Sequence, residues 1–298
     1  MQNAQLTLLV PDVNIDSPSL KTLINRSDTK ELTAKSWEAM LCQLFGINPN
    51  DELPIAAITG LADGLPTHSH YWLRADPTQL QADLSAVYLI GNTALNLTPQ
   101  EVNFLQQGLN QFFKQDQLQL FTPTADRWYL QSNAPPQINT FPLQQVIGKN
   151  ILKFLPQGAN QDYWRKLFTE VQMLLHASTS KVNGLWFWGV GQLPDITDAT
   201  WQAVWSEDIL LKGLAQTAKI PSTPLPKQVQ NILQQLTDSQ HHLVSLSNET
   251  PNAEENWFRP LINALRKKQL NQLTLYLGTD KSFQINTKTI KYFWRRKI

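Results

Sequence analysis

The segment from Glu170 to Gly191 constrains the fold most, because it places a helix, a short turn and an aromatic strand in fixed order. Its first part has apolar residues at helical spacing, and its last part, LWFWGVG, is rich in residues that favour β-strands. Gly189 and Gly191 end this strand, and glycine lets another backbone or a ligand come close. The segment therefore predicts an amphipathic helix followed by a buried strand.

Hydrophobic periodicity predicts a similar mixture along the rest of the chain. Thr98 with Glu101 three residues later forms a capping-box signature, so we expect a helix to begin there. Further helices are expected at 36–45, 54–62, 161–176, 227–236 and 254–267. Strands are expected at 6–10, 71–75, 86–90, 118–121, 127–130, 242–246, 272–277 and 282–285.

These elements predict an α/β protein with mixed sheets flanked by helices. Its 298 residues are enough for two closely packed lobes, which we place at 1–150 and 151–298. The second lobe would hold the LWFWGVG strand and the C-terminal FWRR sequence.

Composition and charge exclude several classes of protein. With 42% hydrophobic and 16% charged residues, the chain is typical of a globular protein. Its formal net charge of +1 gives no global field to attract nucleic acid or an anionic membrane. The C-terminal residues 288–297 mix basic and aromatic side chains, which could grip nucleic acid, but the neutral balance favours docking of the aromatics on the protein body.

The expected compartment is the cytoplasm. Cys42 is the only cysteine, which excludes an intramolecular disulfide and a zinc site made of thiolates. The N-terminus lacks the features of a signal peptide, and no apolar run approaches the roughly 20 residues of a membrane span.

The first candidate ligand site is the alternating set Trp72, Arg74 and Asp76. On a strand these three side chains share one face, where they combine an aromatic plane, a forked cation and a carboxylate. Such a face could hold a small anion or a planar ligand. The alternative is an internal Arg–Asp pair, with Asp83 as another possible partner, that only holds the fold together.

A second candidate ligand site joins the helix to the aromatic strand. Gln172 and His176 lie four residues apart on one helix face, and Asn183 follows shortly afterwards. They could line a polar cleft. Because no hydroxyl here has the spacing of a known nucleophile motif, no catalytic residue is assigned.

A metal site is a further possibility. His68 and His70 are two residues apart, so on a strand they would face the same side, with Asp63 or Asp76 as a third ligand. Asp12 follows the first predicted strand and joins these two histidines as a candidate metal ligand. The alternative is a histidine pair without a metal.

The ten tryptophans offer a stacking platform or an interaction surface. Trp186 and Trp188 would project from one strand face, and Trp201 and Trp205 would lie one helical turn apart. The alternative is ordinary core packing.

Four segments together resemble the RpfE-type regulatory proteins of Gram-negative bacteria, which are cofactor-independent phosphoglycerate-mutase-like. They are LADGLPTHSHYWLRADP at 61–77, RWYL at 127–130, the 170–191 segment and FWRR at 293–296. This resemblance implies a distant relationship to the archaeal-type phosphoglycerate mutases of the alkaline-phosphatase superfamily. Those enzymes use a seryl or threonyl nucleophile and two divalent metals.

The sequence departs from the enzyme pattern that the resemblance implies. The first strand is followed by Pro11, Asp12 and Val13 instead of an acidic, glycine-containing motif, and no paired Asp-His motif follows in the C-terminal half. The loop at 177–181 is also short for an anion-binding role. We therefore expect a non-catalytic protein with a regulatory or ligand-binding role and no evident cofactor.

Two alternatives stay open. The first is a mutase or phosphatase with a rearranged manganese or magnesium site, for which Asp12, His68, His70 and Asp76 are the residues to test. The second is an interaction module that binds a protein partner through its tryptophans.

Overall fold

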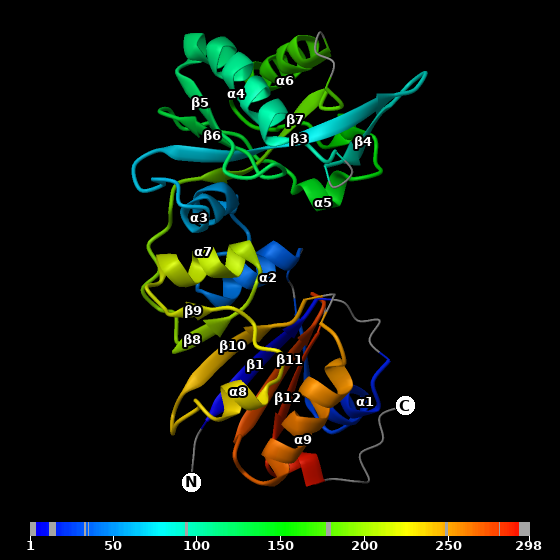
Figure 1. Ribbon diagram of the computed structural model, residues 1–298, viewed down its shortest axis with the longest axis vertical. Coiled ribbons are helices and arrows are strands. Elements are labelled where there is room, and N and C mark those ends of the chain that lie inside the picture. The colour runs from blue at the N-terminus through cyan, green and yellow to red at the C-terminus, as the bar shows by residue number, and fades with distance from the viewer. Residues whose placement is uncertain are drawn as a thin grey trace. The chain divides into compact units, whose positions relative to one another are not determined.

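The computed structural model describes residues 4–11, 16–32, 34, 36–92, 95–176, 180–247, 250–279 and 281–291. The chain forms two compact units, which can be followed by colour in Figure 1. One unit, here called the flanking unit, consists of Met1–Pro49 and Asp195–Ile298. The other, the inserted unit, consists of Asn50–Pro194.

This division differs from the predicted one, because residue 150 falls inside the inserted unit. The physical reason is strand pairing over a long sequence distance. The first strand, β1 (Gln5–Val10), lies between β10 (His241–Ser245) and β11 (Gln272–Leu277) and is parallel to both. The N-terminal segment therefore belongs to the same sheet as the C-terminal one.

The flanking unit is built on a seven-stranded sheet with the order β2-β12-β11-β1-β10-β8-β9. Its five strands from β11 to β9 run parallel, and β12 and β2 add an antiparallel edge. The remaining strands are β2 (Asp28–Glu31), β8 (Ala203–Trp205), β9 (Ser222–Thr223) and β12 (Lys281–Asn286).

Helices cover this sheet because its strands are apolar. Leu6 and Leu8 of β1 pack in one core with Leu23 of α1, Ile232 of α8 and Leu261 of α9. Helix α2 packs against α7, which also contacts β8 and β9. The helices are α1 (Pro18–Asn25), α2 (Trp37–Leu44), α7 (Ile209–Thr217), α8 (Gln230–Leu233), the π-helical turn Glu254–Phe258, α9 (Arg259–Arg266) and the short 3-10 turn Thr289–Lys291.

The inserted unit has a five-stranded antiparallel sheet around the long strand β3. Strand β3 pairs with β7 on one side and with β6 and β4 on the other. The strands are β3 (Tyr71–Ala82), β4 (Val87–Gly91), β5 (Leu118–Phe121), β6 (Tyr129–Ser132) and β7 (Gly184–Gly191). The helices are α3 (Ile55–Ala62), α4 (Pro99–Phe113), α5 (Leu143–Val146) and α6 (Gln161–His176), with 3-10 turns at Lys114–Asp116 and Ile151–Lys153.

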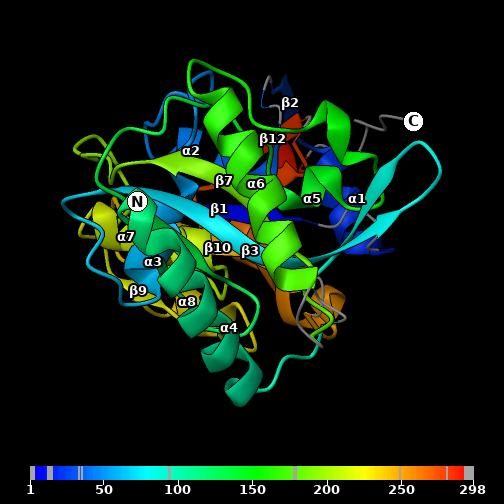
Figure 2. The ribbon, with the colours of Figure 1, turned by 90° about the horizontal axis from the view of Figure 1, so that it is seen from above.

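The predicted helix followed by an aromatic strand is confirmed as α6 and β7. The two elements pack together, and Figure 2 shows α6 lying over β7. Trp164 and Phe168 on α6 meet Phe187 and Trp186 on β7, with ring centroids 5.6 and 6.0 Å apart. Trp164 and Phe168 lie four residues apart, so successive turns of the helix bury its apolar stripe on the strand.

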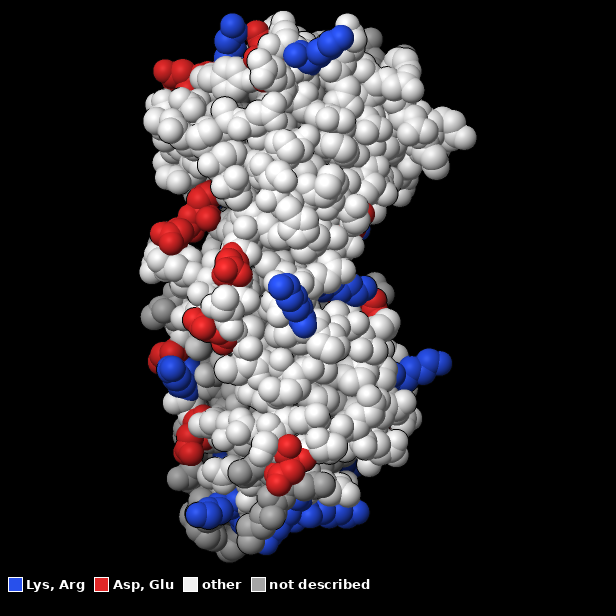
Figure 3. Space-filling model, turned by 90° about the vertical axis from the view of Figure 1, so that its left-hand side faces the viewer, with Lys and Arg blue, Asp and Glu red and all other residues white. Residues whose placement is uncertain are grey.

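The two sheets with their helices confirm the predicted α/β class. None of the helices in the described ranges combines the length and the apolar composition that crossing a membrane requires. On the face shown in Figure 3, the inserted unit carries few charged side chains, and no basic stripe crosses the described part of that face.

Candidate functional site

Trp72, Arg74 and Asp76 are all buried in the inserted unit. Arg74 donates from Nε and Nη2 to Oδ1 of Asp76, at 3.0 and 2.6 Å. The Arg74 guanidinium lies over the rings of Tyr129 and Trp188, 5.2 and 5.3 Å from their centroids. The arginine is therefore enclosed by its counterion and two aromatic planes.

Asp76 has further partners that fix it in place. It accepts hydrogen bonds from Nε1 of Trp188 at 2.7 Å and from the backbone N–H of Trp128 at 3.4 Å. Its side chain is 0% exposed, and that of Arg74 is 7% exposed. Burial raises the pKa of the Asp76 carboxyl, and the charge of Arg74 opposes that rise. Arg74 and Asp76 therefore form an internal ion pair. This arrangement matches the alternative interpretation, a pair that holds the fold together, and not the predicted anion site.

The second predicted site does not come together as a cleft. Asn183 accepts a hydrogen bond from the N–H of Leu80 at 2.6 Å and donates one to the carbonyl of Leu80 at 2.8 Å. Its side chain therefore extends the pairing of β7 with β3. His176 is exposed and Gln172 is half-buried on α6, and within the described residues no hydrogen bond joins either of them to Asn183.

The described part of the chain does not bring a set of predicted metal ligands together. Asp12 lies outside the described residues, and His68 and His70 belong to the inserted unit. Asp63, a proposed third ligand, instead pairs with Arg127 at 2.9 Å and accepts a hydrogen bond from the hydroxyl of Tyr129 at 2.6 Å. In the described part of the chain, no group of three or more His, Cys, Asp or Glu side chains could hold a metal ion.

The four tryptophans proposed as a platform are buried, with exposed fractions of 2 to 8%. Each indole N–H has an acceptor. Trp186 donates to the Phe141 carbonyl and Trp188 donates to Asp76. Trp201 donates to the Leu44 carbonyl and Trp205 donates to His242. Trp205 ends β8, so its predicted place one helical turn after Trp201 is wrong. These residues pack the core and give no binding surface. The FWRR sequence lies outside the described residues.

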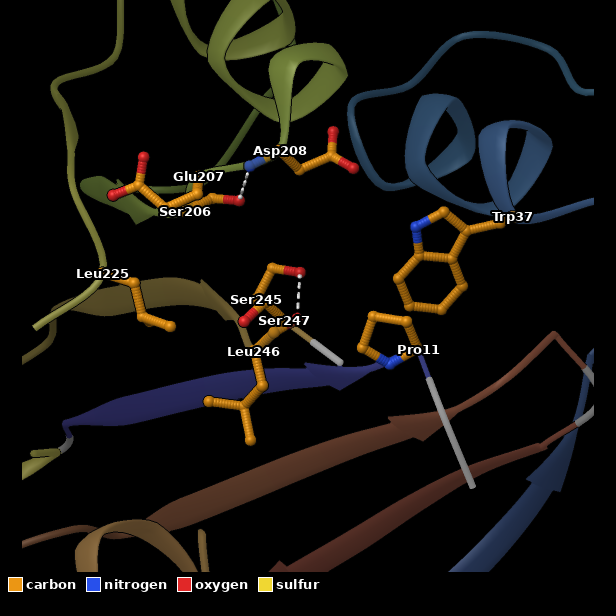
Figure 4. Close-up of a pocket in the computed structure, with 9 residues that line it drawn as sticks. All are labelled: Pro11, Trp37, Ser206, Glu207, Asp208, Leu225, Ser245, Leu246 and Ser247. Carbon is orange, nitrogen blue, oxygen red and sulfur yellow. Dashed lines mark hydrogen bonds between the residues drawn. The ribbon is translucent and has the colours of Figure 1, made fainter. Parts of the chain in front are cut away.

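The flanking unit contains a pocket of about 350 Å³ at the carboxyl ends of three parallel strands, shown in Figure 4. Pro11 follows β1, residues 206–208 follow β8, and residues 245–247 end and follow β10. Trp37 at the start of α2 and Leu225 after β9 complete the lining.

The topology of the sheet explains why a pocket forms here. After β8 the chain passes through α7 to β9, at one edge of the sheet. After β10 it passes through α9 to β11, which lies beyond β1 in the other direction. Since the two connections depart in opposite directions, the loops after these neighbouring strands separate. Open α/β sheets bind ligands in such crevices, outside the carboxyl ends of their strands.

The charges in the pocket already have partners. Asp208 caps α7, and its Oδ1 accepts hydrogen bonds from the N–H groups of Leu210 and Leu211 at 2.8 and 3.0 Å. Burial raises the pKa of Asp208, and these two hydrogen bonds oppose the rise. Glu207 pairs with Nζ of Lys212 at 2.9 Å.

The pocket was not predicted from the sequence, although one signal for it exists. Asp208 directly precedes the apolar run 209–211, which is a helix N-cap pattern. Recognition of that cap would have placed the start of α7, and with it the loop that follows β8.

The lining does not fit the two divalent metals that the family resemblance implies. A two-metal site needs several carboxylates and imidazoles with open coordination. The described lining residues provide two carboxylates, both engaged as above, and no histidine.

Comparisons with known proteins show a likeness of fold. No protein-family model matches the chain, and no curated protein matches it. The PH0037 protein from Pyrococcus horikoshii has a similar structure, with a TM-score of 0.55, 11% identity and coverage of 96% of this chain and 88% of that one. A cofactor-independent phosphoglycerate mutase from Thermoplasma acidophilum DSM 1728 matches with a TM-score of 0.49, 14% identity and coverage of 95% and 89%. At such identities the likeness concerns the fold alone.

Proposed function

We propose that this chain is a non-catalytic regulatory protein of the RpfE type, acting in the cytoplasm, that binds a small ligand in the pocket of the flanking unit. The observation that carries the proposal is the pocket itself, which lies where α/β sheets bind ligands yet presents no metal-binding set among its described residues. The motifs at 61–77, 127–130 and 170–191 support the regulatory assignment.

The chemistry of the lining argues against phosphoryl transfer. A phosphate group is usually held by basic side chains, metals or the free N–H groups of a helix N-terminus. Here the carboxylate of Asp208 occupies the N-terminal N–H groups of α7, and no lysine or arginine is among the described lining residues. A phosphorylated substrate would meet carboxylates instead of cations.

Titration calorimetry with manganese and magnesium tests this proposal. We expect no saturable binding with a Kd below about 1 mM in chelator-treated protein, because the described carboxylates are already engaged. The matched control is Asp12→Ala, since Asp12 follows β1 directly after Pro11. Binding of one or two metal ions per chain that the Asp12→Ala variant loses would refute the proposal in favour of the metal-dependent mutase or phosphatase.

A further inference from the structure

The polar groups of the pocket are of both hydrogen-bonding kinds. In Figure 4 the indole nitrogen of Trp37 and the carboxylate of Asp208 are turned toward the interior, and the hydroxyl of Ser245 faces it from the end of β10. The hydroxyl of Ser206 accepts a hydrogen bond from the backbone N–H of Asp208 at 2.9 Å, which leaves its own hydrogen to be donated. The pocket thus offers two kinds of donor beside a carboxylate acceptor.

These groups disfavour a charged ligand of either sign. An anion would face the carboxylate of Asp208 without a lining lysine or arginine in the described part of the pocket, whereas the Glu207 side chain points away from the interior in Figure 4. A cation would face the indole N–H edge of Trp37, which is the positive edge of the ring. Its attraction to the carboxylates is also reduced, because Lys212 and the α7 N–H groups already partner them.

Hydroxyl groups suit such a lining, because each one both donates and accepts. The apolar side chains of Pro11, Leu225 and Leu246 provide surface for the C–H groups between the hydroxyls. The volume of about 350 Å³ lies near the lower end of the roughly 300–1,000 Å³ of small-molecule sites, so the ligand is small.

We propose that the pocket binds a neutral, polyhydroxylated ligand of monosaccharide size. This inference rests on the proposed function, since it names the ligand class of the same pocket. Oδ2 of Asp208 accepts from a ligand hydroxyl while Oδ1 stays on α7, and Trp37 donates to a ligand oxygen.

Fluorine NMR of protein labelled with fluorotryptophan tests the ligand class. The Trp37→Phe variant identifies the resonance of Trp37 among the ten tryptophans. The probes are glucose, galactose and mannose, each compared with its 2-amino and 6-phosphate derivative, so that ring size is constant and charge changes. We expect at least one neutral sugar to shift the Trp37 resonance saturably, with a Kd at least about tenfold lower than those of both charged derivatives.

Asp208→Asn provides the matched variant, because asparagine caps a helix as well as aspartate does but carries no charge. We expect it to fold normally and to weaken binding of the neutral sugar about tenfold, through loss of a charge-assisted hydrogen bond. Equal or tighter binding of an amino or phosphate derivative would overturn the ligand class while leaving a ligand site in place. A Trp37 resonance that no probe shifts at tens of millimolar would overturn the ligand class.

Discussion

Replacement of Arg74 by methionine is expected to lower the free energy of unfolding by about 3–5 kcal/mol. The change keeps the apolar stem between Tyr129 and Trp188 but leaves the Asp76 carboxylate, which is 0% exposed, without its countercharge. Urea unfolding followed by near-UV circular dichroism measures the loss.

The pH dependence of this loss identifies its cause. Burial raises the pKa of Asp76 in the folded protein, and removal of Arg74 takes away the charge that opposes the rise. The folded variant therefore takes up a proton at Asp76 more readily than the unfolded chain does. The difference between Arg74→Met and the unsubstituted protein should be largest near neutral pH and shrink as the pH falls.

Asp83→Asn is the matched control for this prediction. Asp83 follows β3 directly, at an exposed position, so its replacement should change stability by less than about 0.5 kcal/mol. A loss below about 1 kcal/mol for Arg74→Met, or one that does not depend on pH, would show that the pair is not the internal ion pair described above.

Gly189→Ala is expected to destabilise the protein by about 2–5 kcal/mol. This figure adds the cost of placing alanine in a left-handed backbone conformation to the cost of overpacking. Gly189 has a φ of +65°, and an added Cβ would lie 2.9 Å from Cβ of Ile55 and 3.3 Å from the backbone N of Ala56. Strand β7 can therefore approach α3 only with a glycine at this point. Thermal and urea unfolding measure the effect.

Gly108→Ala supplies the opposite control. Gly108 lies within α4, and an added Cβ would meet nothing within 4 Å. This change should stabilise the protein by about 0.5–1 kcal/mol, because alanine is the better helix former. Equal effects of the two substitutions would contradict the close packing of β7 on α3.

Local sequence signals predicted those elements whose own residues carry a clear cap or a clear hydrophobic period. The capping box of Thr98 and Glu101 does begin α4, and β11 has the predicted bounds 272–277. Strand β2 was missed because its four residues are all exposed and polar, without any apolar alternation. Strand β8 was missed because the spacing of Trp201 and Trp205 was interpreted as helical, and α7 and β9 were not predicted.

The candidate site depends on contacts that no local pattern contains. Alternation placed Arg74 beside Asp76, but whether they faced a cleft or a core was decided by Tyr129 on β6 and Trp188 on β7. The pocket is formed by Pro11, residues 206–208 and residues 245–247, which only the parallel sheet brings together. Sequence patterns identify strands, but the order of strands in a sheet sets which of their ends meet.

We propose that this chain has an α/β fold similar to that of a cofactor-independent phosphoglycerate mutase but does not catalyse the mutase reaction. A coupled phosphoglycerate mutase assay tests this proposal most directly. Purified protein is assayed with 3-phosphoglycerate, with and without manganese or magnesium, beside Asp12→Ala and Asp208→Asn variants purified in the same way. We predict no turnover above the blank under any metal condition, and any trace activity that persists in both variants would come from a contaminating enzyme. Metal-dependent turnover that both substitutions abolish would contradict the account and establish a mutase site at the carboxyl edge of the flanking sheet.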